Sequence, residues 1–140
     1  MARSTSFRIS DQAKSKLAAR AEREGLSATA LLEQLITEGV DQLDWPGIVF
    51  RGPTHDRRAG FAGGPDVWEI VGRLQELAGS EEDRIATLCA ESDLHPRTVR
   101  LALEYAAAHA GQITIRIERN RADAEHARQA AEQRAALLAS

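Results

Sequence analysis

The first residues of the chain alternate in a way that is typical of a β-strand, yet no partner strand follows them. Between Ser4 and Ile9, small or polar residues alternate with heavier ones, which is the two-residue period of a strand. The segments that follow have the period of helices instead. Because an ordered strand must pair its backbone N–H and C=O groups, this segment needs a partner strand. A second copy of the chain can supply one, in an antiparallel ribbon about a two-fold axis.

The two faces of such a ribbon differ in chemistry. Alternation places Thr5, Phe7 and Ile9 on one face and Ser4, Ser6 and Arg8 on the other. The first set would cover a core built from both copies. A two-stranded ribbon fits the major groove of DNA, where polar side chains hydrogen-bond to base edges. The segment therefore predicts a homodimer whose ribbon meets DNA through its polar face.

Two amphipathic helices are predicted after the ribbon segment. Ser10 is a suitable N-cap for the first, and Gly25 a suitable stop. Ser27 then caps the second, over residues 28–43, which Gly39 weakens without ending it. Apolar residues recur along this second helix at Leu31, Leu32, Leu35, Val40 and Leu43.

The stretch STSFRISDQAKSKLAARAEREGLSATALLEQLITEGV, residues 4–40, resembles the ribbon-helix-helix DNA-binding family, the Arc, MetJ and CopG type of repressor. The resemblance implies that Ser4, Ser6 and Arg8 read bases, with Arg8 able to bind guanine bidentately. It also implies a phosphate site at the start of the second helix, formed by Ser27, Ala28 and Thr29. Arg3 and Lys14 are expected to add phosphate contacts.

The distribution of charge agrees with a DNA-binding head. The net charge is −3, but residues 1–24 carry six basic against three acidic groups, an excess of three positive charges. Residues 25–111 carry seven basic against fourteen acidic groups, and residues 112–140 five against four. We therefore expect a polyanion to bind to the N-terminal, positively charged part of the chain, residues 1–24.

Trp45-Pro46-Gly47 interrupts the helical pattern and indicates a second unit. Residues 48–51 read as a strand, residues 57–62 as its hairpin partner, and Pro65 as the first turn of a helix. Further helices are expected after Ser80 and after residue 95. Gly111 is expected to separate these from residues 112–140, whose first part we interpret as helix although Ile113, Ile115 and Ile117 also alternate like a strand. The predicted fold is mainly α, with a ribbon-helix-helix domain (1–44), a β-hairpin plus tri-helical domain (45–111) and a helical tail (112–140).

The second part of the chain carries a weaker resemblance. PGIVFRGPTHDRRAGFAGGPDVWEIV and SDLHPRTVRLALEYAAAH resemble small tri-helical domains that follow the ribbon-helix-helix module in VapB-like antitoxins. The resemblance implies an antitoxin of a type II toxin-antitoxin system that represses its own operon and neutralises a PIN-domain, VapC-type ribonuclease. Such nucleases hold Mg²⁺ with carboxylates. An arginine from a partner could pair with these carboxylates and obstruct metal binding. The candidates in the tail are Arg116, Arg119, Arg121, Arg128 and Arg134.

Other interpretations of these features stay open. The tail arginines could instead pair with acidic residues on the same helix, as Arg121 with Glu125 and Arg128 with Glu132. Residues 85–106 look like a helix-turn-helix, although the acidic charge of residues 25–111 argues against a second DNA reader. A repressor without a toxin partner, or a helical adaptor that binds no DNA, remains an alternative function.

No catalytic or metal-binding motif emerges. The four histidines lie far apart, and Cys89 sits among apolar residues as a packed thiol. We therefore expect no enzyme activity, no metal and no cofactor. The single cysteine and the lack of a long apolar run favour a cytoplasmic protein without a membrane span.

Overall fold

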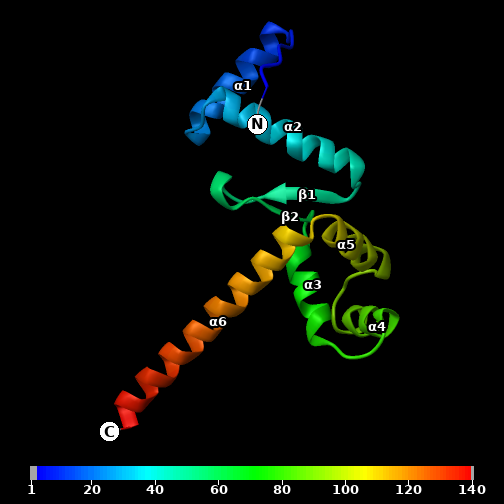
Figure 1. Ribbon diagram of the computed structural model, residues 1–140, viewed down its shortest axis with the longest axis vertical. Helices are drawn as coiled ribbons and strands as arrows, with labels where there is room; N and C mark the ends of the chain where they lie inside the picture. The colour runs from blue at the N-terminus through cyan, green and yellow to red at the C-terminus, as the bar shows by residue number, and fades with distance from the viewer. Residues whose placement is uncertain (1–2, 140) are drawn as a thin grey trace. The chain divides into compact units, whose positions relative to one another are not determined.

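The computed structural model describes residues 3–139 and is mainly helical (Figure 1). The chain divides into two compact units, Met1–Pro46 and Gly47–Ser140. The described residues form six α-helices and one two-stranded antiparallel sheet. The mainly α character and the single hairpin of the predicted fold are thus confirmed.

The first unit contains the two predicted helices, α1 (Asp11–Glu24) and α2 (Ala28–Asp44). The Ser10 hydroxyl accepts a hydrogen bond from the Ala13 N–H at 3.1 Å, so it is the N-cap of α1. Gly25 ends α1 with φ of 68°, a left-handed conformation that favours glycine. Ser27 caps α2 in the same way as Ser10 caps α1. All three predicted capping residues are confirmed.

The segment before α1 forms no strand in this single chain. Residues 3–10 belong to no helix or strand, and all of them are exposed. A strand needs a partner for its backbone groups, and the predicted partner is a second copy. The ribbon therefore stays a prediction.

The first unit has very little core of its own. Ala21 of α1 and Leu31 of α2 are its buried apolar residues, at 3% and 2% exposure. Most of the apolar residues predicted along α2 are exposed in this single chain.

The second unit begins with a β-hairpin. Strands β1 (Ile48–Arg51) and β2 (Arg58–Phe61) pair antiparallel, with Ile48 opposite Phe61 and Arg51 opposite Arg58. A short 3₁₀ turn, η1 (Thr54–Asp56), lies between them. This confirms the predicted hairpin, and an additional bridge from Gly60 to Asp66 ties it to the start of the next helix.

Three helices follow the hairpin: α3 (Val67–Glu76), α4 (Glu81–Glu91) and α5 (Pro96–Ala108). Ser80 caps α4 as predicted, accepting from the Asp83 N–H at 3.1 Å. We expected Pro65 to lie in the first turn of α3, but it lies before the helix. Asp66, which follows it, takes the N-cap position and forms a capping box with Glu69.

The last helix, α6 (Ala110–Ala139), is 30 residues long and continuous. Gly111 does not separate it from the preceding domain, because this glycine lies inside the first turn of α6. The predicted helical state of residues 112–118 is confirmed, with Ile113 and Ile117 buried on the side that packs into the unit. The expected boundary at residues 111–112 thus falls within one helix.

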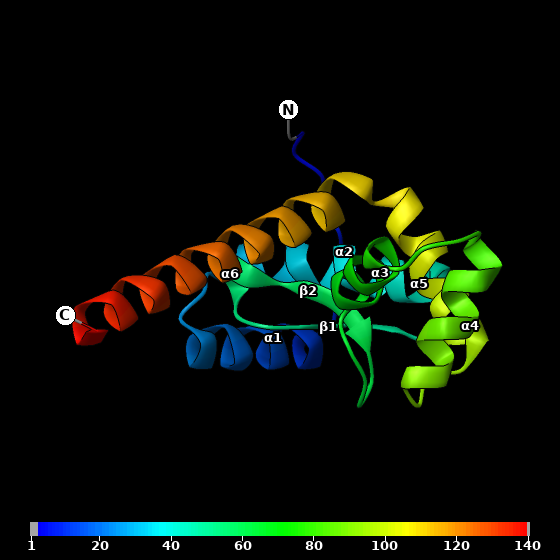
Figure 2. The same cartoon turned by 90° about the horizontal axis from the view of Figure 1, so that it is seen from below.

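The core of the second unit lies around α3, which contacts α4, α5 and α6. Tyr105, Val67 and Val99 are its largest fully buried side chains. Within this unit, Figures 1 and 2 agree that the C-terminal half of α6 runs away from α3, α4 and α5. Residues 121–139 are all exposed except Ala130, which is half-buried.

Candidate nucleic-acid interface

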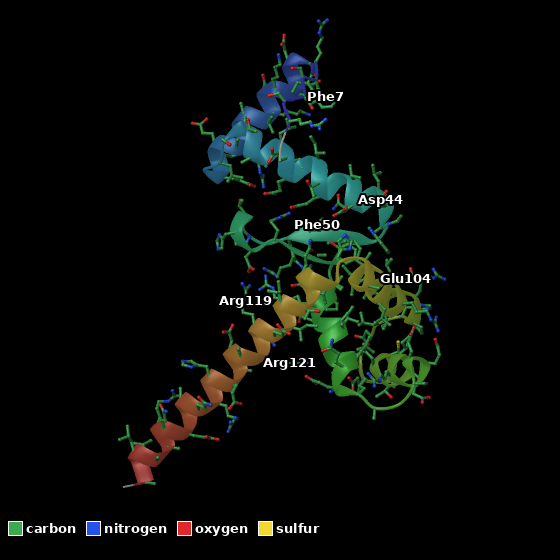
Figure 3. The ribbon with its side chains drawn as sticks, viewed as in Figure 1. Phe7, Asp44, Phe50, Glu104, Arg119 and Arg121 are labelled. Carbon is green, nitrogen blue, oxygen red and sulfur yellow. The ribbon has the colours of Figure 1, made fainter. Side chains whose placement is uncertain are left out.

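The predicted base-reading residues lie on the exposed segment before α1. Ser4, Ser6 and Arg8 are exposed, as are Arg3 on the same segment and Lys14 in the first part of α1. Phe7, which alternation places on the opposite side from Arg8, has 81% of its surface exposed (Figure 3). A side chain of this size is left in water unless another surface covers it.

The start of α2 retains the features of an anion site. The Ser27 hydroxyl accepts from the Ala30 N–H at 3.1 Å. Within residues 3–139, no hydrogen bond uses the backbone N–H of Ala28 or Thr29. These two donors and the exposed Thr29 side chain lie at the positive end of the helix dipole, where a phosphate is favoured.

One side of α2 is apolar and exposed. We call this the α2 apolar face, formed by Leu32, Leu35, Ile36, Val40 and Leu43, whose exposed fractions run from 38% for Leu32 to 81% for Leu43. Leu32, Ile36 and Leu43 fall at i, i+4 and i+11, so they share one side of the helix. Gly39, at i+7, completes that stripe, and a Cβ built on it would meet nothing within 4 Å.

The tail arginines separate into two groups. Arg116 and Arg119, on α6, both bind the Asp56 carboxylate of the 3₁₀ turn, Arg119 through Nη2 at 3.0 Å. Burial would raise the pKa of Asp56, but the hydrogen bonds and charges of the two guanidinium groups outweigh it and hold that pKa below its ordinary value. These two arginines are therefore part of the second unit and not of a separate tail.

The remaining three arginines lie further along α6. Arg121 donates to the Gln75 side chain of α3 at 2.8 Å. Among the described residues it forms no pair with Glu125, the partner that the alternative interpretation gave it. Arg128 binds Glu125 and Glu132 on its own helix, as the alternative interpretation predicted. Arg134 has no ion pair or hydrogen bond within the described part of the chain.

A charged cluster that the sequence analysis missed fastens the hairpin to α3. The Asp66 carboxylate, 7% exposed, accepts from Arg51 Nε at 2.6 Å and Arg58 Nε at 2.7 Å. Burial raises the pKa of Asp66, but the two arginines more than compensate and lower it. Gly60 makes room, since a Cβ there would lie 2.2 Å from the Arg51 guanidinium. The sequence signal for this cluster is an arginine on each strand next to the turn, Arg51 and Arg58, followed by an aspartate at a helix N-cap, Asp66.

The predicted helix-turn-helix corresponds to α4 and α5. His95 caps α5, its Nδ1 accepting from the Arg97 N–H at 3.0 Å. Arg100 donates to Glu82 of α4 at 3.0 Å, so it is held against an acidic helix start.

The described residues contain no group of three histidine, cysteine, aspartate or glutamate side chains that could hold a metal ion. Between residues 3 and 139, no helix combines the length and the apolar character that crossing a membrane requires. A hollow of about 390 Å³ is lined by α3, α4 and α5, with Val71, Leu74 and Leu103 as its apolar residues. Arg84 also lines it.

Comparison with known proteins gives no further identification. No protein-family model matches the chain, and searches of curated proteins and of solved structures returned no match. The resemblance to ribbon-helix-helix repressors therefore depends on residues 4–40 themselves.

Proposed function

We propose that this chain forms a ribbon-helix-helix homodimer that binds operator DNA, and that it serves as an antitoxin that represses its own operon. The observation that carries the proposal is the exposed α2 apolar face in a unit whose buried apolar residues are Ala21 and Leu31. Two helices with so small a core are not expected to be stable alone.

A second copy is the occupant that fits this face. Full burial of a large aliphatic side chain contributes about 1.5–3 kcal/mol, and the α2 apolar face offers five such side chains per copy. Phe7 and Ile9 add apolar surface from the segment before α1. The unpaired backbone of Ser4–Ile9 finds its partner in the same event, so dimerisation and folding of the first unit are coupled.

Pairing of the two segments turns Ser4, Ser6 and Arg8 away from the dimer core. These are the side chains that would enter the major groove, with Arg8 the strongest discriminator of bases. The open N–H groups of Ala28 and Thr29 then bind a backbone phosphate on each side, with Arg3 and Lys14 adding positive charge.

The antitoxin part of the proposal concerns α6. Its second half is exposed along residues 122–139 apart from Ala130, and Leu137 and Leu138 are 77% and 88% exposed. In proteins most helical stability comes from packing of a helix face, so a partner covering Leu137 and Leu138 would stabilise this half. We propose that this half binds the PIN-domain ribonuclease, with Arg134 as the arginine available for its carboxylates.

A gel-shift assay on the DNA upstream of the gene tests the DNA-binding part. Arg8→Ala should abolish specific binding while the dimer persists in size-exclusion chromatography. Arg134→Ala removes the same charge from α6 and should leave binding unchanged. Equal affinity of the Arg8→Ala variant and the wild type would refute the ribbon.

Co-expression with the product of the adjacent gene tests the antitoxin part. We expect the two proteins to co-purify and the nuclease to be inactive in the complex. A protein that binds the upstream DNA but captures no neighbour would be a repressor without a toxin.

A further inference from the structure

A hollow on the second unit combines an apolar lining with a guanidinium group. We call it the α3–α5 hollow, after the helices α3, α4 and α5 that contribute its lining residues. Its volume of about 390 Å³ falls within the range of about 300–1,000 Å³ that is typical of small-molecule sites. Its apolar residues are Val71, Leu74 and Leu103. Leu74 is buried, whereas Val71 and Leu103 are only half-buried, so a ligand could still cover apolar surface there.

Arg84, on α4, lines the hollow with a half-buried side chain. Its Nε donates to the Gly79 carbonyl at 3.0 Å, and its Nη1 donates to the Leu74 carbonyl at 3.4 Å. Among residues 3–139, no carboxylate forms an ion pair with Arg84, and its Nη2 has no acceptor. The two carbonyls hold the guanidinium in place without neutralising its charge. A charged group that is partly removed from water gains from an anionic partner.

Gln75, on α3, adds a second donor to the hollow. Its side-chain oxygen accepts from Arg121 Nη2 at 2.8 Å, which leaves the NH₂ end of the amide as a donor. In the part of the chain that the structure describes, this NH₂ group has no acceptor. Arg84 and Gln75 therefore both contribute unused N–H donors to the lining of one hollow. An ionised carboxylate is the complementary group, because its two oxygens only accept hydrogen bonds.

One acidic side chain also lines the hollow. Glu81 lies in the first turn of α4 and is exposed. The positive end of the helix dipole favours a carboxylate at this position, and solvent ions screen the repulsion between this exposed charge and a second anion. Glu81 therefore weakens the attraction of an anion to Arg84 without cancelling it.

We propose that the α3–α5 hollow is a binding site for a small carboxylate with an aliphatic body. The carboxylate binds the unused donors of Arg84 and Gln75 through charge-assisted hydrogen bonds. The aliphatic body covers Val71, Leu74 and Leu103, whose burial adds to the affinity. A neutral aliphatic ligand would leave the guanidinium without an anion, and an inorganic anion would leave the apolar lining in water. Every residue of this site belongs to the second unit, so the site does not require the first unit to bind DNA.

Titration of the full chain with octanoate tests the site. Methyl resonances of isotope-labelled protein show where the probe binds, and calorimetry gives its affinity. We expect saturable shifts at Val71, Leu74 and Leu103. Octanol has the same chain without the charge and should bind weaker by about tenfold or more, the loss expected for a hydrogen bond to a charged group. Hexanoate lacks two CH₂ groups and should bind about 15-fold more weakly, at about fourfold for each CH₂.

Substitutions separate recognition of the charge from support of the fold. Arg84→Gln removes the charge and should lower octanoate affinity by about tenfold or more, with octanol binding unchanged. Arg97→Gln removes the charge of an exposed arginine on α5 and should leave the affinity for both probes unchanged. Glu81→Gln should raise octanoate affinity by about two- to fivefold, because it removes the acidic side chain from the lining.

The other outcomes are also decisive. Equal affinity for octanoate and octanol in the wild type would show that Arg84 recognises no carboxylate, and shifts confined to the α2 apolar face would place the probe on another surface. Either result overturns the inference, as does a lack of octanoate binding at millimolar concentration. If Arg84→Gln loses its helical circular dichroism, the wild-type comparison of octanoate, hexanoate and octanol decides, since it needs no substitution.

Discussion

The Asp66 carboxylate joins two elements of the second unit, because it accepts a hydrogen bond from Arg51 Nε at 2.6 Å while its residue is the N-cap of α3. Its other oxygen accepts from Arg58 Nε at 2.7 Å and from the Trp68 indole N–H at 3.2 Å. One side chain therefore fastens both strands of the hairpin to the start of a core helix.

Replacing this carboxylate should destabilise the second unit. Asp66→Ala removes the carboxylate that the half-buried Arg51 and Arg58 share and leaves Arg58 with only its longer contact to Asp56. We expect a loss on the order of 3 kcal/mol in the free energy of unfolding. Denaturant titration followed by tryptophan fluorescence measures it, in a Trp45→Phe background that leaves Trp68 as the single tryptophan. Asp93→Ala, which removes an exposed carboxylate, should change stability by less than about 0.5 kcal/mol. Similar effects of the two substitutions would contradict the role given to Asp66.

The same carboxylate should make the stability of the second unit fall in acid. The folded-state pKa of Asp66 lies below its ordinary value, because two arginines outweigh the effect of burial. Its contribution is therefore present above the unfolded pKa of about 3.9 and is lost as the pH falls through the lower folded value. Unfolding measured at a series of pH values should show this loss below about pH 4. The dependence should be smaller in Asp66→Ala, and an equal dependence would contradict the assignment.

A charge on the α2 apolar face should prevent dimerisation. Ile36 is 52% exposed in the single chain and would be buried in the dimer, where an unpaired carboxylate is costly. We expect Ile36→Asp to be monomeric by light scattering, with less helix by circular dichroism and no DNA binding. Thr37→Asp, on the adjacent exposed position, is the control and should remain dimeric. A dimeric, DNA-binding Ile36→Asp protein would show that this face is not the interface.

Truncation should divide α6 into a core part and a partner-binding part. Removal of residues 122–140 leaves Ile113 and Ile117 in the core, so the second unit should keep its thermal midpoint. Removal of residues 112–140 takes away both buried isoleucines, each worth about 2–5 kcal/mol, and should unfold the unit. Co-purification with the neighbouring protein should be lost in the shorter truncation. Full capture by that truncated protein would exclude the second half of α6 as the binding segment.

Much of the local structure follows from the sequence. Ser10, Ser27 and Ser80 cap their helices, and Gly25 stops α1, because capping depends on one side chain and the next three residues. The hairpin at 48–61 follows likewise from two short strand patterns around a turn. Pro65 was misplaced by two residues because Asp66 competes for the cap, with Glu69 completing a capping box.

Contacts between residues that lie far apart in the sequence cannot be predicted from caps and periodicity. Asp56 lies 60 residues before Arg116 in the sequence, and no periodicity signals that pair. The starts of the helices and the apolar side of α2 can be predicted from the sequence. That Ile113 and Ile117 join the core while the α2 apolar face stays open is visible only in the folded chain. Burial depends on which surfaces the folded chain brings together, whereas caps and periodicity depend only on neighbouring residues.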